Sequence, residues 1–132
     1  MRDYQRTKGK YILPRAVYMQ TIWVIRDYHR LIDERAGLLA GPSSKPIDGM
    51  PHGSSYNPDG VMFEAVRLAE IDDKIKAIES ARDTIPEGYR KAVWENILYG
   101  TPYPLMGERS TYGHYKSKMI MLTATRLGLY RE

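Results

Sequence analysis

The chain has 132 residues, the size of one domain or of one domain with an appendage. It contains no cysteine, which excludes disulfide staples, thiolate nucleophiles and zinc sites with cysteine ligands. Apolar residues make up 42% and charged residues 27%, as in an ordinary globular protein. No stretch approaches the roughly 18 consecutive apolar residues of a membrane span, and the N-terminus leads into no apolar signal run. We therefore expect a cytoplasmic protein with no membrane partner.

The net charge of +4 is distributed unevenly along the chain. Residues 1–35 hold eight Lys or Arg against four Asp or Glu, and residues 86–132 hold seven against four. Residues 36–60 hold one against two, and residues 61–85 hold four against six. Basic ends around a mildly acidic middle are the distribution expected if both ends meet a polyanion, although +4 also suits a protein that is merely soluble.

Residues 1–13 are predicted to form a mobile basic arm, because they carry cations without an apolar period. Its cations are Arg2, Arg6, Lys8 and Lys10. From Pro14 to about Ala40, apolar residues recur at steps of three and four, which predicts one long amphipathic helix. His29 lies within this row, so we expect it to be a packing residue.

Residues 41–60 are predicted to be an irregular linker, because Gly, Pro and Ser fill 12 of the 20 positions. A second amphipathic helix restarts near Pro58, and its row is later interrupted by Arg82. Pro86 must end or bend it. Two long amphipathic helices in sequence most simply pair as an antiparallel hairpin, so residues 14–85 are predicted to form a helical hairpin.

Residues 86–132 are predicted to form two further helices, which resemble a helix-turn-helix. The first runs from Glu87 to about Tyr99. The second runs over 110–127, with Ser110 as its cap and Gly128 closing it. No segment shows clear strand alternation. The fold class is therefore all-α: a long antiparallel hairpin plus a C-terminal helix pair.

The helix 110–127 has an outer face that suits nucleic acid. At 100° per residue, one side carries Tyr112, Tyr115, Met119, Leu122, Thr123 and Leu127 and is expected to face the core. The opposite side carries Met121 and Thr125. Its other residues, closer to the start of the helix, are rich in hydroxyls and cations and include no carboxylate. With the preceding Arg109, the predicted DNA-binding residues are Arg109, Ser110, Thr111, His114, Ser117 and Lys118. Short donors near a helix N-terminus can read base edges, while cations meet phosphates.

An enzyme is the minority hypothesis. No glycine-rich phosphate loop and no pairing of a nucleophile with a base is legible, and His29, His52 and His114 lie far apart in the sequence. We expect no catalytic residue, no metal site and no cofactor. The acidic residues near Glu70 are expected to form pairs on a solvated helix surface.

Several runs resemble small proteins of Firmicutes prophages that are grouped with late-transcription regulators of the RinA and ArpU type. These runs are Tyr11-Ile12-Leu13-Pro14-Arg15-Ala16-Val17-Tyr18, Ile25-Arg26-Asp27-Tyr28-His29-Arg30-Leu31, Asp48-Gly49-Met50-Pro51-His52-Gly53, Ile85-Pro86-Glu87-Gly88-Tyr89-Arg90-Lys91 with Trp94, and Ser110-Thr111-Tyr112-Gly113-His114-Tyr115-Lys116-Ser117-Lys118. The resemblance implies a C-terminal part similar to the promoter-binding fourth region of sigma factors, in the cytoplasm of a bacterial host. His114 stands where such relatives would be expected to carry an arginine.

Two hypotheses follow for the function. In the first, the chain is a sequence-specific regulator of phage or prophage transcription that binds double-stranded DNA through helix 110–127. The arm would then contact the DNA backbone, and the hairpin would form a homodimer or dock on RNA polymerase. In the second, the chain is a phage assembly or packaging accessory protein whose helical hairpin is a protein-interaction module.

Overall fold

The computed structural model describes residues 4–41 and 58–131, with only the backbone at Pro58 and Asp59. Its elements are α1 (Arg15–Arg26), α2 (Tyr28–Ala40), α3 (Pro58–Arg82), α4 (Glu87–Tyr99) and α5 (Arg109–Arg126). No strand occurs in the described ranges, so the predicted all-α class is confirmed. None of the helices in those ranges is long and apolar enough to cross a membrane.

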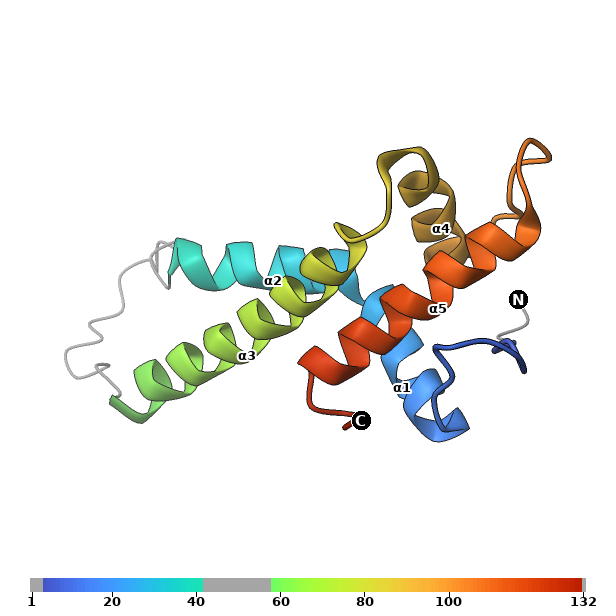
Figure 1. Cartoon of the computed structure of the whole chain (residues 1–132). Helices are drawn as coiled ribbons and strands as arrows, with labels where there is room; N and C mark the ends of the chain where they lie inside the picture. Colours follow the sequence, from blue (N-terminus) through green and yellow to red (C-terminus); the bar gives the residue numbers. More distant parts are fainter. Residues whose placement is uncertain (1–3, 42–57, 132) are drawn as a thin grey trace.

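The helical hairpin consists of α2 and α3, which lie side by side in opposite directions and extend away from the other helices (Figure 1). The predicted apolar row of α3 is confirmed: Ile71, Ile75 and Ile78 are fully buried. Leu31 of α2 belongs to the same core. Most of the predicted linker, residues 42–57, lies outside the described residues, and α3 already begins at Pro58.

The first predicted helix is not continuous, because the chain bends at Asp27 between α1 and α2. The hairpin therefore starts at Tyr28, and α1 leaves it to pack against α4 and α5. The buried row changes at the bend, from Tyr18, Ile22 and Ile25 in α1 to Tyr28 and Leu31 in α2. His29 falls outside the new row and is exposed, so its predicted packing role is wrong.

Arg82 lies in the apolar row of α3 because aromatic rings cover its guanidinium. Its Cζ lies 4.9 Å from the ring centroid of Trp94 and 5.6 Å from that of Tyr28. The two rings meet edge to face with centroids 5.1 Å apart. A cation over aromatic faces keeps a favourable electrostatic contact where water is partly excluded. This cluster joins α2, α3 and α4 at the base of the hairpin.

The C-terminal half of α5 lies at the centre of the fold. Met119, Ile120 and Ala124 are at most 1% exposed, and α1, α3 and α4 all contact this helix. Met121 is also buried, so its predicted place on the outer face is wrong: helices pack against α5 from more than one side. The helix ends as predicted, with Gly128 at φ +75° and the Leu129 N–H donating to the Ala124 carbonyl oxygen (2.9 Å).

The start of α5 differs from the predicted cap. Glu108 occupies the cap position in an extended conformation, and its side chain makes no capping hydrogen bond. Ser110 lies one residue inside the helix rather than before it. The end of α4 matches its prediction, because Gly100 adopts the left-handed conformation at φ +71° and its N–H donates to the Asn96 carbonyl oxygen.

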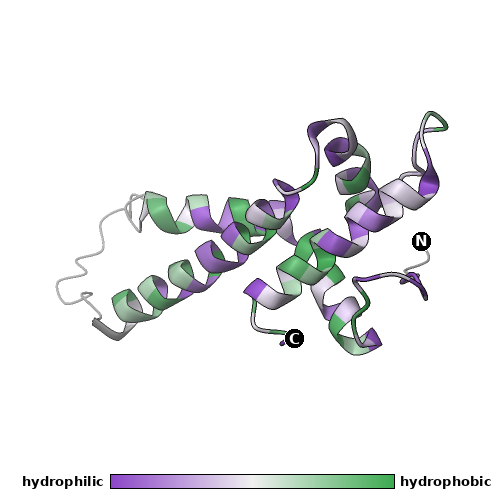
Figure 2. Ribbon diagram, viewed as in Figure 1, coloured by the Kyte–Doolittle hydropathy of each residue, from purple (hydrophilic) through white to green (hydrophobic). Residues whose placement is uncertain are grey.

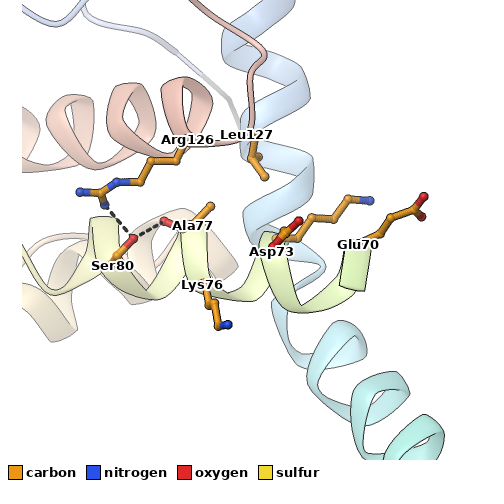
Figure 3. A pocket seen from close by; sticks show the side chains of 8 residues that line it. Glu70, Asp73, Lys76, Ala77, Ser80, Arg126 and Leu127 are labelled. Carbon is orange, nitrogen blue, oxygen red and sulfur yellow. Dashed lines mark hydrogen bonds between the residues drawn. The ribbon is translucent and has the colours of Figure 1, made fainter. Parts of the chain in front are cut away.

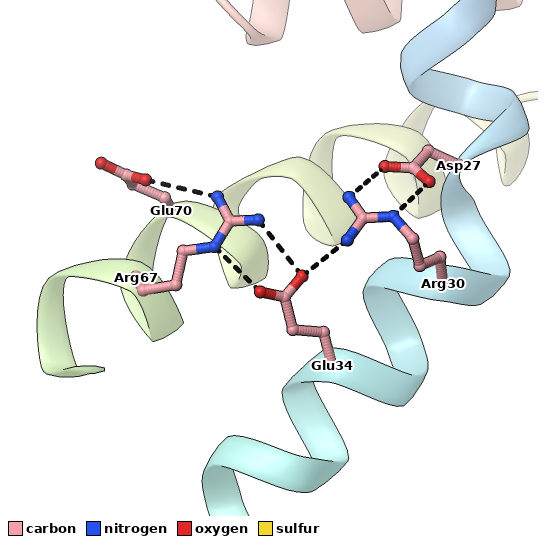
Figure 4. Close-up of polar contacts among 5 residues, drawn as sticks. All are labelled: Asp27, Arg30, Glu34, Arg67 and Glu70. Carbon is pink, nitrogen blue, oxygen red and sulfur yellow. Dashed lines mark hydrogen bonds and ion pairs between the residues drawn. The ribbon is translucent and has the colours of Figure 1, made fainter. Parts of the chain in front are cut away.

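A chain of ion pairs runs along one edge of the hairpin (Figure 4). The Arg67 guanidinium donates to Glu34 of α2 (3.0 Å), and Arg30 donates to both Glu34 (3.0 Å) and Asp27 (2.6 Å). The Arg67 hydrogen bond lowers the pKa of Glu34, and that of Arg30 lowers the pKa of Asp27. All these side chains are at least a quarter exposed. Exposed ion pairs contribute about 0–1 kcal/mol each to the free energy of unfolding. They therefore help to align α2 with α3, whereas the burial of apolar side chains supplies most of the stability of the hairpin.

Two substitutions should separate these contributions. Ile75→Ala should lower the free energy of unfolding by about 2–5 kcal/mol, because it removes a fully buried side chain from the hairpin core. Glu34→Gln should cost less than about 1 kcal/mol. Urea denaturation followed by circular dichroism measures both. A larger loss in Glu34→Gln than in Ile75→Ala would contradict this account of the hairpin.

Candidate nucleic-acid interface

The N-terminal half of α5 projects away from the central core toward the α4–α5 connector, residues 100–108 (Figure 1). Stacked tyrosines hold the connector in place. The Tyr103 ring lies parallel to that of Tyr112 with centroids 4.9 Å apart, and Tyr89 of α4 meets Tyr112 edge to face at 5.2 Å. The Tyr112 hydroxyl donates to the Met106 carbonyl oxygen (3.3 Å). The connector is longer than that of a strict helix-turn-helix, but its path is fixed by these contacts.

The basic arm is folded back against the protein from Tyr4 onward, in place of the mobile arm expected from the sequence. The Gln5 side chain bridges to Leu13, donating to its carbonyl oxygen (2.8 Å) and accepting from its N–H (2.6 Å). The Tyr18 hydroxyl of α1 donates to the Tyr4 carbonyl oxygen (2.9 Å). The arm is therefore a closed loop, fastened to α1 at one end.

This loop lies along α5. The Arg6 guanidinium donates to the Ser110 carbonyl oxygen (3.5 Å), and its side chain runs beside Gly113. A Cβ at position 113 would stand 3.3 Å from the Arg6 Cδ, closer than most such contacts. Farther along, the rings of Tyr11 and His114 meet with centroids 5.5 Å apart. Glycine at position 113 therefore lets the arm approach the helix backbone.

A cavity of about 460 Å³ lies between the arm, α1, α4, the connector and α5, and we call it the basic pocket. It is lined by Tyr4, Arg6, Tyr18, Asn96, Tyr103, Arg109, Ser110, Gly113, Lys116 and Ser117. Three of these lining residues are cations, five carry a Tyr or Ser hydroxyl, and none carries a carboxylate. The Lys116 ammonium donates to the Asn96 side-chain oxygen (2.8 Å), which directs it across to α4. Cations and hydroxyl donors without a carboxylate are the groups that bind a phosphate oxygen.

The predicted DNA-binding residues are divided between two sides of α5. Arg109, Ser110 and Ser117 line the basic pocket together with the arm. Thr111, His114 and Lys118 lie on the adjacent side, outside the pocket lining, where His114 is exposed and Lys118 half-buried. The arm runs between the two groups, since it touches both Ser110 and His114.

The cations of the arm are also distributed differently from the prediction. Arg6 joins the pocket, Lys8 is exposed, and the Lys10 ammonium lies 5.7 Å from the Tyr11 ring centroid. Arg2 lies outside the described residues. The arm and α5 therefore form one basic surface, whereas the sequence suggested two separate ones.

Asn96 and Tyr103 were missed by the sequence analysis, and Lys116 was not among its predicted DNA-binding residues. The 100° count places Lys116 near the core side of α5, and it is the neighbouring α4 that turns this position into a pocket wall. The long side chain of Lys116 was the feature from which its place in the pocket could have been predicted. A lysine at the edge of a core row extends its ammonium toward the polar surface.

A second cavity, of about 520 Å³, lies between α3 and the end of α5 (Figure 3). Glu70 and Asp73 line it together with Lys74, Lys76 and Arg126, so its charges are mixed. Arg126 already donates to the Ser80 hydroxyl (2.8 Å). An anion would meet two carboxylates here, which makes the basic pocket the better anion site.

Comparison with known proteins gives no match: no protein-family model matches the chain, and neither a curated protein nor a solved structure does. No cluster of three or more His, Asp or Glu that could hold a metal ion occurs in residues 4–41 and 58–131. The groups gathered at the basic pocket are guanidinium, ammonium and hydroxyl groups, which bind anions through charge and hydrogen bonds.

The burial of Tyr103 in the connector predicts how the stability of the fold changes in alkaline solution. Burial raises the pKa of the Tyr103 hydroxyl to about 12, and Arg109 and Arg6 oppose this effect only in part. The folded state favours the neutral phenol, so this contribution to stability is complete below about pH 10, the pKa of an unfolded tyrosine, and is lost as the pH rises toward 12. In Tyr103→Phe, the free energy of unfolding should fall less steeply with pH over that range than in the wild type. Urea denaturation at a series of pH values measures this. An unchanged pH dependence would refute the assignment.

Proposed function

We propose that this chain binds double-stranded DNA through the N-terminal half of α5 and the arm folded against it. The observation that carries the proposal is the basic pocket, where Arg6 of the arm meets Arg109 and Lys116 of α5 and no carboxylate lines the wall. The phosphate groups of DNA form a polyanion that such a surface would bind. Cations on the rim of the pocket would neutralise phosphates, and the counterions condensed on the DNA would be released.

The dimensions of α5 support insertion into the major groove. An α-helix with its side chains is about 10–12 Å in diameter, and the major groove is about 12 Å wide, so residues 109–118 could lie in it. The buried C-terminal half of α5 anchors this segment to the core, so its orientation is fixed before DNA is bound. In the proposed complex His114 and Thr111 face base edges, while Lys118 meets a phosphate on their side of the helix.

The arm supplies the second set of phosphate contacts. Arg6 and Arg109 lie on the pocket side of α5, whereas Lys118 lies outside the pocket, about 180° from Arg109 at 100° per residue. A helix in the major groove has a phosphate backbone on each side of it. The two groups of cations would therefore contact the two strands. The Tyr11 ring can keep its tilted contact with His114 only if that ring does not insert deeply, so the arm also sets how far α5 enters the groove.

Regulation of phage or prophage transcription is the setting that the resemblance to RinA- and ArpU-type proteins favours, with RNA polymerase as a further partner. The alternative is an assembly or packaging accessory protein that acts as a protein-interaction module. Its support is the apolar surface at the distal end of the hairpin, where Leu39, Met62 and Phe63 are each about two-thirds exposed or more. A DNA-binding measurement separates the two hypotheses, because an interaction module needs no affinity for DNA.

Lys118→Ala and His114→Ala should change DNA binding in different ways. Loss of the Lys118 phosphate contact should weaken binding to all sequences alike and reduce the slope of log affinity against log salt by about one. Loss of His114 should relax sequence preference by about 1–3 kcal/mol. Fluorescence anisotropy over a range of salt concentrations measures both, with melting temperature as the check on folding. Unchanged affinity in both variants would remove α5 as the reading element.

Arg6→Ala tests the arm. The Arg6 hydrogen bond to α5 is exposed and long, at 3.5 Å, so the variant should keep its melting temperature. Its DNA affinity should fall, with a shallower salt dependence, because one phosphate contact is lost. Lys76→Ala is the matched control, since it also removes one cation but lies on α3, paired with Asp72 (2.7 Å). Equal losses in the two variants would show that only net charge matters.

A further inference from the structure

The distal half of α3 carries an apolar surface that the described part of the chain leaves uncovered. Val61 is 52% exposed, Met62 66% and Val66 50%, and Leu39 at the end of α2 is 67% exposed. At 100° per residue the α3 positions fall within about 140° of the helix. We call this surface the α3 strip: Leu39, Val61, Met62, Ala65, Val66 and Ala69. Figure 2 shows apolar residues at this end of the hairpin, away from α5.

We propose that the α3 strip pairs with the α3 strip of a second copy of this chain, with the two α3 helices antiparallel across a two-fold axis. Their closest approach would be at Ala65. A helix that is apolar on its outer side as well as its inner side is normally buried on both. The inner side of α3 packs on α2, and the pairing would bury the outer side.

The shape of the strip fits another helix. Ala65 and Ala69 lie one turn apart and are both exposed, so they form a shallow floor between larger side chains. A cavity of about 500 Å³ at this place is lined by both alanines, by Leu39 and Leu68, and by the ion pair of Arg35 with Asp72 (3.0 Å). Small residues let two helix axes approach closely, and bulkier side chains of the partner then fill the space beside them.

The strip complements itself in this orientation. Antiparallel pairing centred on Ala65 sets Val61 of each copy opposite Ala69 of the other, so that a larger side chain meets a smaller one. The same register sets Asp72 and Asp73 opposite the start of α3 in the second copy. The start of a helix carries a partial positive charge, which favours acidic side chains nearby.

The size of the strip suits a weak dimer. A Val, Leu or Met side chain loses on the order of 100 Å² when fully buried, and the larger side chains of the strip are half to two-thirds exposed, so the strip presents a few hundred Å² per copy. Pairing would bury less than about 1,000 Å² in total, which is the range of weak and transient interfaces. We therefore expect a dimer that dissociates at micromolar concentrations rather than an obligate one.

The linker is the other candidate to cover the strip, but its composition fits poorly. Residues 42–57 supply only Ile47, Met50 and Tyr56 as large apolar side chains, among three prolines, two glycines and four serines. A second copy supplies a complete strip of matching shape. The linker and a different protein remain as outcomes that the experiment distinguishes from self-association.

Sedimentation equilibrium without DNA tests the proposal. The wild-type chain should fit a monomer–dimer equilibrium. Ala65→Glu should raise the dissociation constant at least tenfold, because a longer charged side chain would stand at the closest approach. Ala65 is exposed in the single chain, so the variant should keep the wild-type helix content and melting temperature. Ala16→Glu, at an exposed position of α1, is the matched control and should dimerise like the wild type.

Cysteine cross-linking tests the register. The chain has no cysteine, so Ala65→Cys introduces a single thiol at the proposed axis. Under mild oxidation it should form a disulfide-linked dimer within the range of concentrations at which the wild type associates, and Ala16→Cys should not. A disulfide requires Cα atoms within about 7 Å, which only pairing near Ala65 provides.

A wild-type monomer at hundreds of micromolar would overturn the proposal and leave the linker or a different protein as the partner of the strip. A dimer that Ala65→Glu does not weaken would overturn it as well, because the interface would then lie elsewhere. Neither result depends on DNA, so the proposed DNA-binding function can fail or hold independently.

Discussion

The burial of the C-terminal half of α5 is the constraint on which the rest of this fold depends. Met119, Ile120 and Ala124 are sealed by α1, α3 and α4, so three helices take their positions from one. A helix held in this way over its second half is stiff over its first, because the backbone hydrogen bonds continue without a break from Arg109 to Arg126. The projecting N-terminal half can therefore hold its side chains in a fixed orientation even though other helices do not surround it.

The bend at Asp27 makes this arrangement compatible with a hairpin. A straight helix from residue 15 to residue 40 could pack on α5 or on α3, but not along its whole length on both. At the bend Asp27 accepts a hydrogen bond from Arg30, and the neighbouring Arg26 donates to the Ile97 carbonyl oxygen near the end of α4 (2.9 Å). These contacts satisfy polar groups at the corner, so that the change of direction leaves few of them unpaired.

Local signals in the sequence were sufficient for most of the elements. Pro86 and Gly100 bound α4 as expected, and the isoleucine row of α3 is the core of the hairpin. The bend at Asp27 was not predictable in this way, because the apolar period runs on through it and an aspartate is common on a helix surface. Met121 was misplaced for a related reason: a helical wheel assumes one buried side, whereas α5 is packed from several.

The candidate site was only partly predictable, because it depends on contacts between distant segments. The hydroxyl-rich face of α5 could be predicted from residue types and helical spacing alone. The approach of Arg6 to Ser110 joins residues 104 positions apart, and no local pattern encodes it. Gly113 was the one local sign, since a glycine within a helix often marks a close approach by another segment.

The two surfaces proposed here depend on different forces, and they lie on different parts of the molecule. The basic pocket gathers cations at the projecting end of α5, whereas the hairpin charges are paired with one another along the edge formed by Arg30, Glu34 and Arg67. Salt screens the contacts of the basic pocket with phosphate but leaves apolar burial largely intact. Self-association should therefore persist at salt concentrations that release DNA, because it depends mainly on the burial of apolar side chains.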